Sequence, residues 1–176
     1  MGVFTARSLE PYNECMEFPI ETWRSLVDTF HDTMIATAHL ADARRDLSGK
    51  RDDGEWTLRD MVAHLIDSFS NNHQRFVRLQ LESSLSFPGY DADSWRAVQK
   101  VDSLDYRLLC DMWKACNGYL LSVIAGIEDK TLTNVWQSPE GPKTLGFLVE
   151  DYFSHIAWHL DFFECRVREL LSAEQR

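Results

Sequence analysis

The sequence predicts an all-α protein in which four long helices pack as a bundle. Four segments place apolar residues at three- and four-residue steps, which is the spacing of one helix face. We find no convincing alternation of apolar and polar residues of the kind that marks a half-buried strand. The length of 176 residues suits one domain with its own core. We expect an extended lead-in at residues 1–18 and a single four-helix-bundle domain at residues 19–176.

A charged loop separates the first two predicted helices. The first helix is expected over residues 20–47, where its apolar spacing meets a Ser-Gly stop signal. The loop at residues 50–55 is charged and contains a glycine. The second helix, residues 57–83, has a clear start, because Thr57 can cap it and Asp60 occupies the capping-box position three residues later.

The second half of the chain predicts two further long helices. A long connection, residues 84–102, contains a short helix at 91–98 and could be a crossover that brings the fourth helix beside the second. The fourth helix is expected over residues 144–170, after a connection at 131–142 that could form a short extended hairpin. The third helix is expected over residues 103–127, with an inward stripe made of Leu104, Leu108, Met112, Tyr119, Leu120, Val123 and Ile127.

Composition and charge exclude several classes of protein. The formal net charge is −10, and the basic residues have acidic neighbours, so no basic face is available for nucleic acid or for anionic lipid. No apolar run approaches the roughly 18 residues that span a bilayer, and the first 17 residues lack the apolar core of a signal peptide. The four cysteines fit no zinc-binding spacing and are expected to be inert core thiols. We expect a cytoplasmic protein that binds neither nucleic acid nor membranes.

Three histidines are the candidate metal ligands. His155 and His159 lie four residues apart on the predicted fourth helix and therefore project from one face. His64 lies on the apolar stripe of the second helix, where an imidazole loses hydration and needs a partner. Three neutral imidazoles from two neighbouring helices can share a divalent ion and leave its fourth position open. The alternative is that the pair on the fourth helix consists of partly buried, hydrogen-bonded histidines.

The other histidines are not expected to join this site. His73 lies nine residues after His64, which places it on the opposite face of the helix. His31 and His39 lie outside the strongest stripe of the first helix, so we expect them at the surface.

Three stretches of the chain resemble the DinB/YfiT-like superfamily of small helical bundles. They are residues 56–65 (WTLRDMVAHL), residues 88–95 (PGYDADSW) and residues 144–159 (TLGFLVEDYFSHIAWH), the last with its H-x-x-x-H spacing. The resemblance implies an up-up-down-down four-helix bundle, a homodimer, and a metal triad made of His64, His155 and His159.

The candidate ligands and the resemblance together indicate a metal-dependent enzyme. Three imidazoles suit zinc or nickel, with Fe(II) a further option, and Asp67 or Asp151 could accept the outward N–H of a ligating histidine. Members of the superfamily include thiol transferases, a thiol-dependent isomerase and hydrolases. We therefore expect an S-transferase that uses a low-molecular-weight thiol, or a hydrolase, acting on a small electrophilic molecule. The alternative is a non-catalytic bundle that senses or stores a metal or small ligand.

Overall fold

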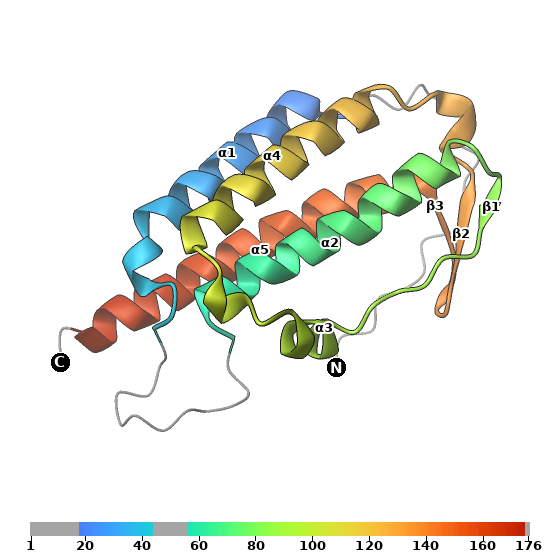
Figure 1. The fold of residues 1–176 in the computed structure, drawn as a ribbon. Coiled ribbons are helices and arrows are strands. Elements are labelled where there is room, and N and C mark those ends of the chain that lie inside the picture. The colour runs from blue at the N-terminus through green and yellow to red at the C-terminus, as the bar shows by residue number, and fades with distance from the viewer. Residues whose placement is uncertain (1–17, 44–55, 175–176) are drawn as a thin grey trace.

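Four long helices, one short helix and a small sheet make up the part of the chain that the computed structural model describes, residues 18–43 and 56–174 (Figure 1). The all-α four-helix bundle is confirmed. The expected lead-in and the loop at residues 50–55 fall almost wholly outside the described residues, so the domain boundaries stay a prediction. The helices are α1 (Ile20–Ala36), α2 (Leu58–Leu79), α3 (Ala92–Gln99), α4 (Tyr106–Ala125) and α5 (Leu145–Glu174). The strands are β1 (Ser84–Leu85), β2 (Val135–Ser138) and β3 (Gly141–Thr144).

The four long helices run up-down-down-up along the chain, which corrects the expected up-up-down-down order (Figure 1). The start of α2 lies beside the start of α4, because the Arg59 side chain donates to the Leu104 carbonyl. The end of α2 lies beside the start of α5, where Asn134 donates to the Leu79 carbonyl at 2.6 Å. Helices α2 and α4 begin at the same end of the bundle and are therefore parallel. The connection between them consequently runs the length of the bundle. The predicted contact between the second and fourth long helices is confirmed, because α5 packs on α2.

Local capping explains where two of the helices begin. Thr57 and Asp60 form the predicted capping box of α2, with Thr57 Oγ1 accepting from the Asp60 backbone and the Asp60 carboxylate accepting from the Thr57 backbone. Helix α5 begins after Thr144, whose hydroxyl accepts from the Phe147 backbone at 3.2 Å. The end of α1 was predicted too late, because the chain leaves the α-helix at Ala36 and buries Leu40 from a 3₁₀ turn instead.

The inward stripe predicted for the third long helix is wrong at the first four of its seven residues. Trp113, fully buried, and Cys110 set the inward face of α4. The outward residues are exposed in the following fractions: Leu104 45%, Leu108 61%, Met112 48% and Tyr119 56%. Apolar residues occupy two faces of this helix, so spacing alone could not tell which face packs between α1 and α2.

Aromatic side chains fill the centre of the bundle. The Phe30 ring contacts Trp113 of α4 and Phe163 of α5 edge-on, at centroid distances of 5.2 and 5.4 Å. One buried polar contact joins α4 to α5, because the Tyr152 hydroxyl donates to Asn117 Oδ1 at 2.7 Å. Edge-to-face packing and a satisfied buried hydrogen bond both fix how these helices meet.

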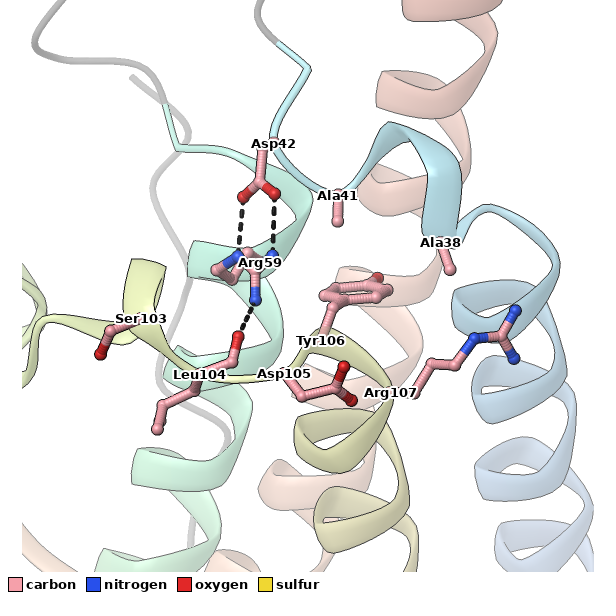
Figure 2. A pocket seen from close by; sticks show the side chains of 9 residues that line it. All are labelled: Ala38, Ala41, Asp42, Arg59, Ser103, Leu104, Asp105, Tyr106 and Arg107. Carbon is pink, nitrogen blue, oxygen red and sulfur yellow. Dashed lines mark hydrogen bonds and ion pairs between the residues drawn. The ribbon is translucent and has the colours of Figure 1, made fainter.

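A buried arginine ties together the end of the bundle where α2 and α4 begin (Figure 2). Arg59 donates two hydrogen bonds to the Asp42 carboxylate, at 2.7 and 2.8 Å, and a third to the Leu104 carbonyl. Its guanidinium also lies 5.6 Å from the centre of the Tyr106 ring. Through this fork of charge-assisted hydrogen bonds, Arg59 of α2 connects the segment that follows α1 with the segment that leads into α4.

A three-stranded sheet lies at the opposite end, where α2 ends and α5 begins (Figure 1). Its order is β1-β2-β3, with β1 parallel and β3 antiparallel to β2. The predicted hairpin in the connection before the fourth long helix is confirmed. Gly141 adopts a φ of 117° in its tight turn, a conformation that favours glycine. Trp136 of β2 donates to the Phe87 carbonyl at 2.8 Å, which fixes the sheet against the crossover segment.

Candidate metal centre

The three candidate histidines converge between α2 and α5. His64 comes from α2, and His155 and His159 come from successive turns of α5. One ring nitrogen of each lies within 4.8 Å of those of the other two. The Nε2 atoms of His155 and His159 are 3.0 Å apart. The i,i+4 spacing on one helix and the apolar position on the other thus produce a single cluster of imidazoles.

Burial keeps these imidazoles neutral at physiological pH. Desolvation lowers the pKa of His64 to about 4, helped by the charge of His155. It lowers the pKa of His159 to about 3, helped by the charges of His155 and His64. The pKa of His155 is lowered by burial, and the nearby Asp151 partly opposes this. Neutral imidazole is the form that ligates a metal, so the cluster is in its binding form.

The residues present fit a divalent ion. Two neutral imidazole nitrogens 3.0 Å apart repel unless a proton or a cation lies between them. His159 Nδ1 is buried without a hydrogen-bond partner among the described residues, so its ring has little polar compensation in the protein. A shared ion would use all three nitrogen lone pairs together. Three imidazoles and no carboxylate form a donor set that suits zinc, nickel or Fe(II).

Tyr90 supports His64 and was not among the predicted site residues. Its hydroxyl lies 3.3 Å from His64 Nδ1, and Trp56 contacts the same ring edge-on at a centroid distance of 5.1 Å. Burial raises the pKa of Tyr90, so the phenol stays protonated. Tyr90 lay within the PGYDADSW stretch, but only the folding of the crossover over α2 brings it to the cluster.

The two carboxylates predicted to support the ligands lie in different settings. Asp67 is buried and accepts from Gln99 at 2.8 Å, and no hydrogen bond joins it to His64 in the described structure. Burial raises the pKa of Asp67. Asp151 is exposed, one turn before His155, and lines the cavity beside the cluster. Of these candidates for support, Tyr90 is the one that contacts His64 in the described structure, and the roles predicted for Asp67 and Asp151 stay predictions.

The remaining histidines lie away from the cluster. His73 contacts Phe69 and Tyr119 between α2 and α4, at centroid distances of 5.6 and 5.4 Å. His39 is exposed, as predicted. His31 is not a surface residue, because its side chain is only 14% exposed and its Nε2 lies 2.8 Å from Asp111 Oδ1.

The described cysteines are all free, and they differ in exposure. Cys110 is buried, and burial raises its thiol pKa to about 11, as expected of an inert core thiol. Cys165 is exposed, which contradicts the expected core position. Cys15 lies outside the described residues.

A cavity of about 540 Å³ opens beside the cluster. Helices α2 and α5 form two of its walls, and the hairpin and Tyr90 form the rest. His64 and His155 both line it, so two of the three histidines face its interior. This volume suits a small organic molecule.

Comparison with known proteins agrees with this architecture. The family model of the DinB superfamily matches residues 20–162. The chain belongs to this superfamily. The four-helix bundle agrees with membership of the DinB superfamily. None of the described helices combines the length and the apolar character that a membrane span needs.

Two curated relatives of this DinB-superfamily chain carry metal-related names. "Putative metal-dependent hydrolase OB0413" from Oceanobacillus iheyensis is 22% identical over 153 residues, which cover 87% of this chain and 86% of that protein. "Putative metal-dependent hydrolase YfiT" from Bacillus subtilis is 22% identical over 118 residues, covering 67% and 65%. The solved structure of YfiT, described as "a probable metal-dependent hydrolase with an unusual four-helix bundle topology", matches with a TM-score of 0.64 and 20% identity over 90% of this chain and 93% of that one.

Proposed function

We propose that this protein is a metal-dependent enzyme that hydrolyses a small molecule in the cavity beside the histidine cluster. The observation that carries the proposal is the convergence of three neutral imidazoles from α2 and α5 at the wall of a cavity of about 540 Å³. The names of the two relatives support hydrolysis as the reaction class. His64, His155 and His159 would hold the ion.

The side chains around the cluster have separate roles in this proposal. A divalent ion held by three imidazoles lowers the pKa of water and polarises a substrate carbonyl or phosphoryl group. Tyr90 fixes the orientation of the His64 ring through its hydroxyl, and Trp56 restricts solvent on the same side. Asp151 lines the cavity one turn from His155 and is placed to accept a proton.

Transfer of a low-molecular-weight thiol to a small electrophile is the second candidate reaction. Among the described residues that line the cavity there is no cysteine, so a sulfur nucleophile would have to come from a bound cofactor. Zinc, one of the three candidate metals, binds thiolates readily. A non-catalytic role in sensing or storing a ligand remains the alternative from a different class.

Metal analysis of protein purified without a His tag tests the centre itself. We expect one divalent ion per chain in the wild type and in the control variant His73→Ala, and loss of that ion in His155→Ala. Circular dichroism should show that all three proteins are folded. Absence of metal from the wild type under metal-replete conditions would overturn the proposal.

Activity assays then separate the candidate reactions. The metal-loaded protein is screened with a panel of esters, amides and lactones, and separately for consumption of small thiols with electrophiles. Hydrolysis that His155→Ala loses supports the hydrolase, and metal-dependent thiol consumption alone assigns the transferase. No metal-dependent turnover in either screen would refute catalysis and favour the sensor.

A further inference from the structure

Arg75 is a buried cation without a carboxylate partner in the described structure. Only 8% of the residue is exposed, yet its Nε is buried with no hydrogen-bond partner. The guanidinium stacks at 3.8 Å over the Trp136 ring and donates one bond to Asn72 Oδ1 at 3.3 Å. Burial lowers the pKa of Arg75, and Tyr90 partly opposes this shift. A cation buried in this way has lost much of the hydration that stabilises its charge in water.

Arg59 shows what a structural arginine looks like in the same protein. It is equally buried, at 8% exposure, but both oxygens of Asp42 accept from it (Figure 2). The two arginines are on the same helix, α2, near its opposite ends. Arg59 therefore has its counter-ion within the protein, whereas Arg75 faces the cavity without one.

Arg75 and the histidine cluster are separated along the cavity. Arg75 follows His64 by 11 residues, which is three helical turns and a rise of ~16 Å on one face of α2. Ser68 and Asn72 line the cavity on the turns between them. On α5, Asp151 and Leu148 continue the opposite wall from His155 in the same direction, because α5 is antiparallel to α2. The cavity is thus elongated, with the imidazoles towards one end and the guanidinium towards the other.

The other charged groups at the cavity do not neutralise Arg75. Lys143 and Glu140 pair with each other at 3.0 Å on the hairpin. Asp151 lies on the turn of α5 next to His155, and its charge acts on the pKa of that histidine. An arginine fork with free donors binds a carboxylate or a phosphate through paired hydrogen bonds.

We propose that Arg75 binds an oxyanion, a carboxylate or a phosphate, carried by the substrate at the end remote from its reacting group. The substrate is then an elongated small anion, with its reacting group at the histidines and its charge at Arg75. This inference rests on the proposed function for the reaction, but the anion site itself can be measured without metal.

Anion binding to metal-free protein tests the site directly. Inorganic phosphate and acetate are titrated into the full chain, with neutral acetamide as the control ligand, and the melting temperature and binding heat are recorded. We expect phosphate, acetate or both to stabilise the wild type. Arg75→Met should weaken that binding by at least about tenfold, as loss of a charge-assisted hydrogen bond predicts. Binding of phosphate alone assigns a phosphate, and binding of acetate alone a carboxylate.

Three further variants make the result specific. Lys143→Met, at the same cavity but paired with Glu140, should change anion affinity less than twofold. Arg75→Lys, which keeps the charge without the fork, should fall between the wild type and Arg75→Met. His155→Ala should lose metal but keep the anion response, so failure of the metal centre and failure of the anion site give different results.

The stability of Arg75→Met separates a binding role from a structural one. Without added anion, we expect this variant to melt at or above the wild-type temperature, because it removes a buried charge that lacks a counter-ion. A lower melting temperature combined with unchanged anion binding would overturn the proposal. Equal binding of acetamide and of the anions would overturn it as well.

Discussion

The hydrogen bond between Tyr152 and Asn117 makes a quantitative prediction about how α4 and α5 are held together. Tyr152 is 2% exposed and Asn117 is fully buried, and the bond between them is 2.7 Å long. The Asn117 amide nitrogen is already used, because it donates to the Trp113 carbonyl at 2.9 Å. Tyr152→Phe therefore leaves Asn117 Oδ1 buried without that donor and changes little else.

The expected loss in free energy of unfolding is about 1–3 kcal/mol, the usual cost of an unsatisfied buried polar group. Urea unfolding of the metal-free protein at pH 7, followed by circular dichroism, measures it, with an unchanged slope against denaturant. Tyr119→Phe is the matched control, because Tyr119 is 56% exposed and its change should stay within about 0.5 kcal/mol. A Tyr152→Phe effect as small as that of the control would refute the reasoning.

Three further predictions concern the metal centre and assembly. The metal-free protein should lose stability as the pH falls below 6.5 towards 4. The reason is that His64 and His159, whose folded pKa values are about 4 and 3, take up protons at a higher pH in the unfolded chain than in the folded one. A urea midpoint that does not fall between pH 7 and pH 5 would contradict this. Tyr90→Phe should weaken metal affinity by about tenfold, measured by chelator competition, whereas an unchanged affinity would remove Tyr90 from the support of His64. Light scattering should give twice the chain mass, as the expected homodimer requires, and a monomeric wild type would refute the homodimer. Trp158→Glu should lower the measured mass, because Trp158 is exposed and stacks on Phe162, which is also exposed.

The sequence predicted those features that depend on local spacing. The capping box at Thr57 and Asp60 fixed the start of α2, and the i,i+4 pair on α5 with the apolar position of His64 indicated the cluster. These signals hold because a helix repeats every 3.6 residues, so side-chain direction follows from position.

Features that depend on how the helices pack against one another could not be predicted in this way. Leu108 and Trp113 are both apolar residues on α4, and only the positions of α1 and α2 decide that Trp113 is the buried one. Tyr90 reaches His64 across 26 positions of sequence, which no local pattern encodes. The direction of α4 likewise depends on the path of the crossover, since a helix has the same apolar spacing in either direction.

The parallel arrangement of α2 and α4 has a consequence for how this protein can vary. The 26 residues between Leu79 and Tyr106 must travel the whole length of the bundle, whereas antiparallel neighbours could be joined by a short turn. Helix α3, within this segment, buries no residue, but Tyr90 of the same segment contacts the candidate metal ligand His64. Insertions or substitutions at residues 86–100, none of which is buried, can therefore reshape the wall of the cavity at little cost to the core. Two chains with the same bundle and the same three histidines can therefore differ in the shape of this cavity through this segment alone.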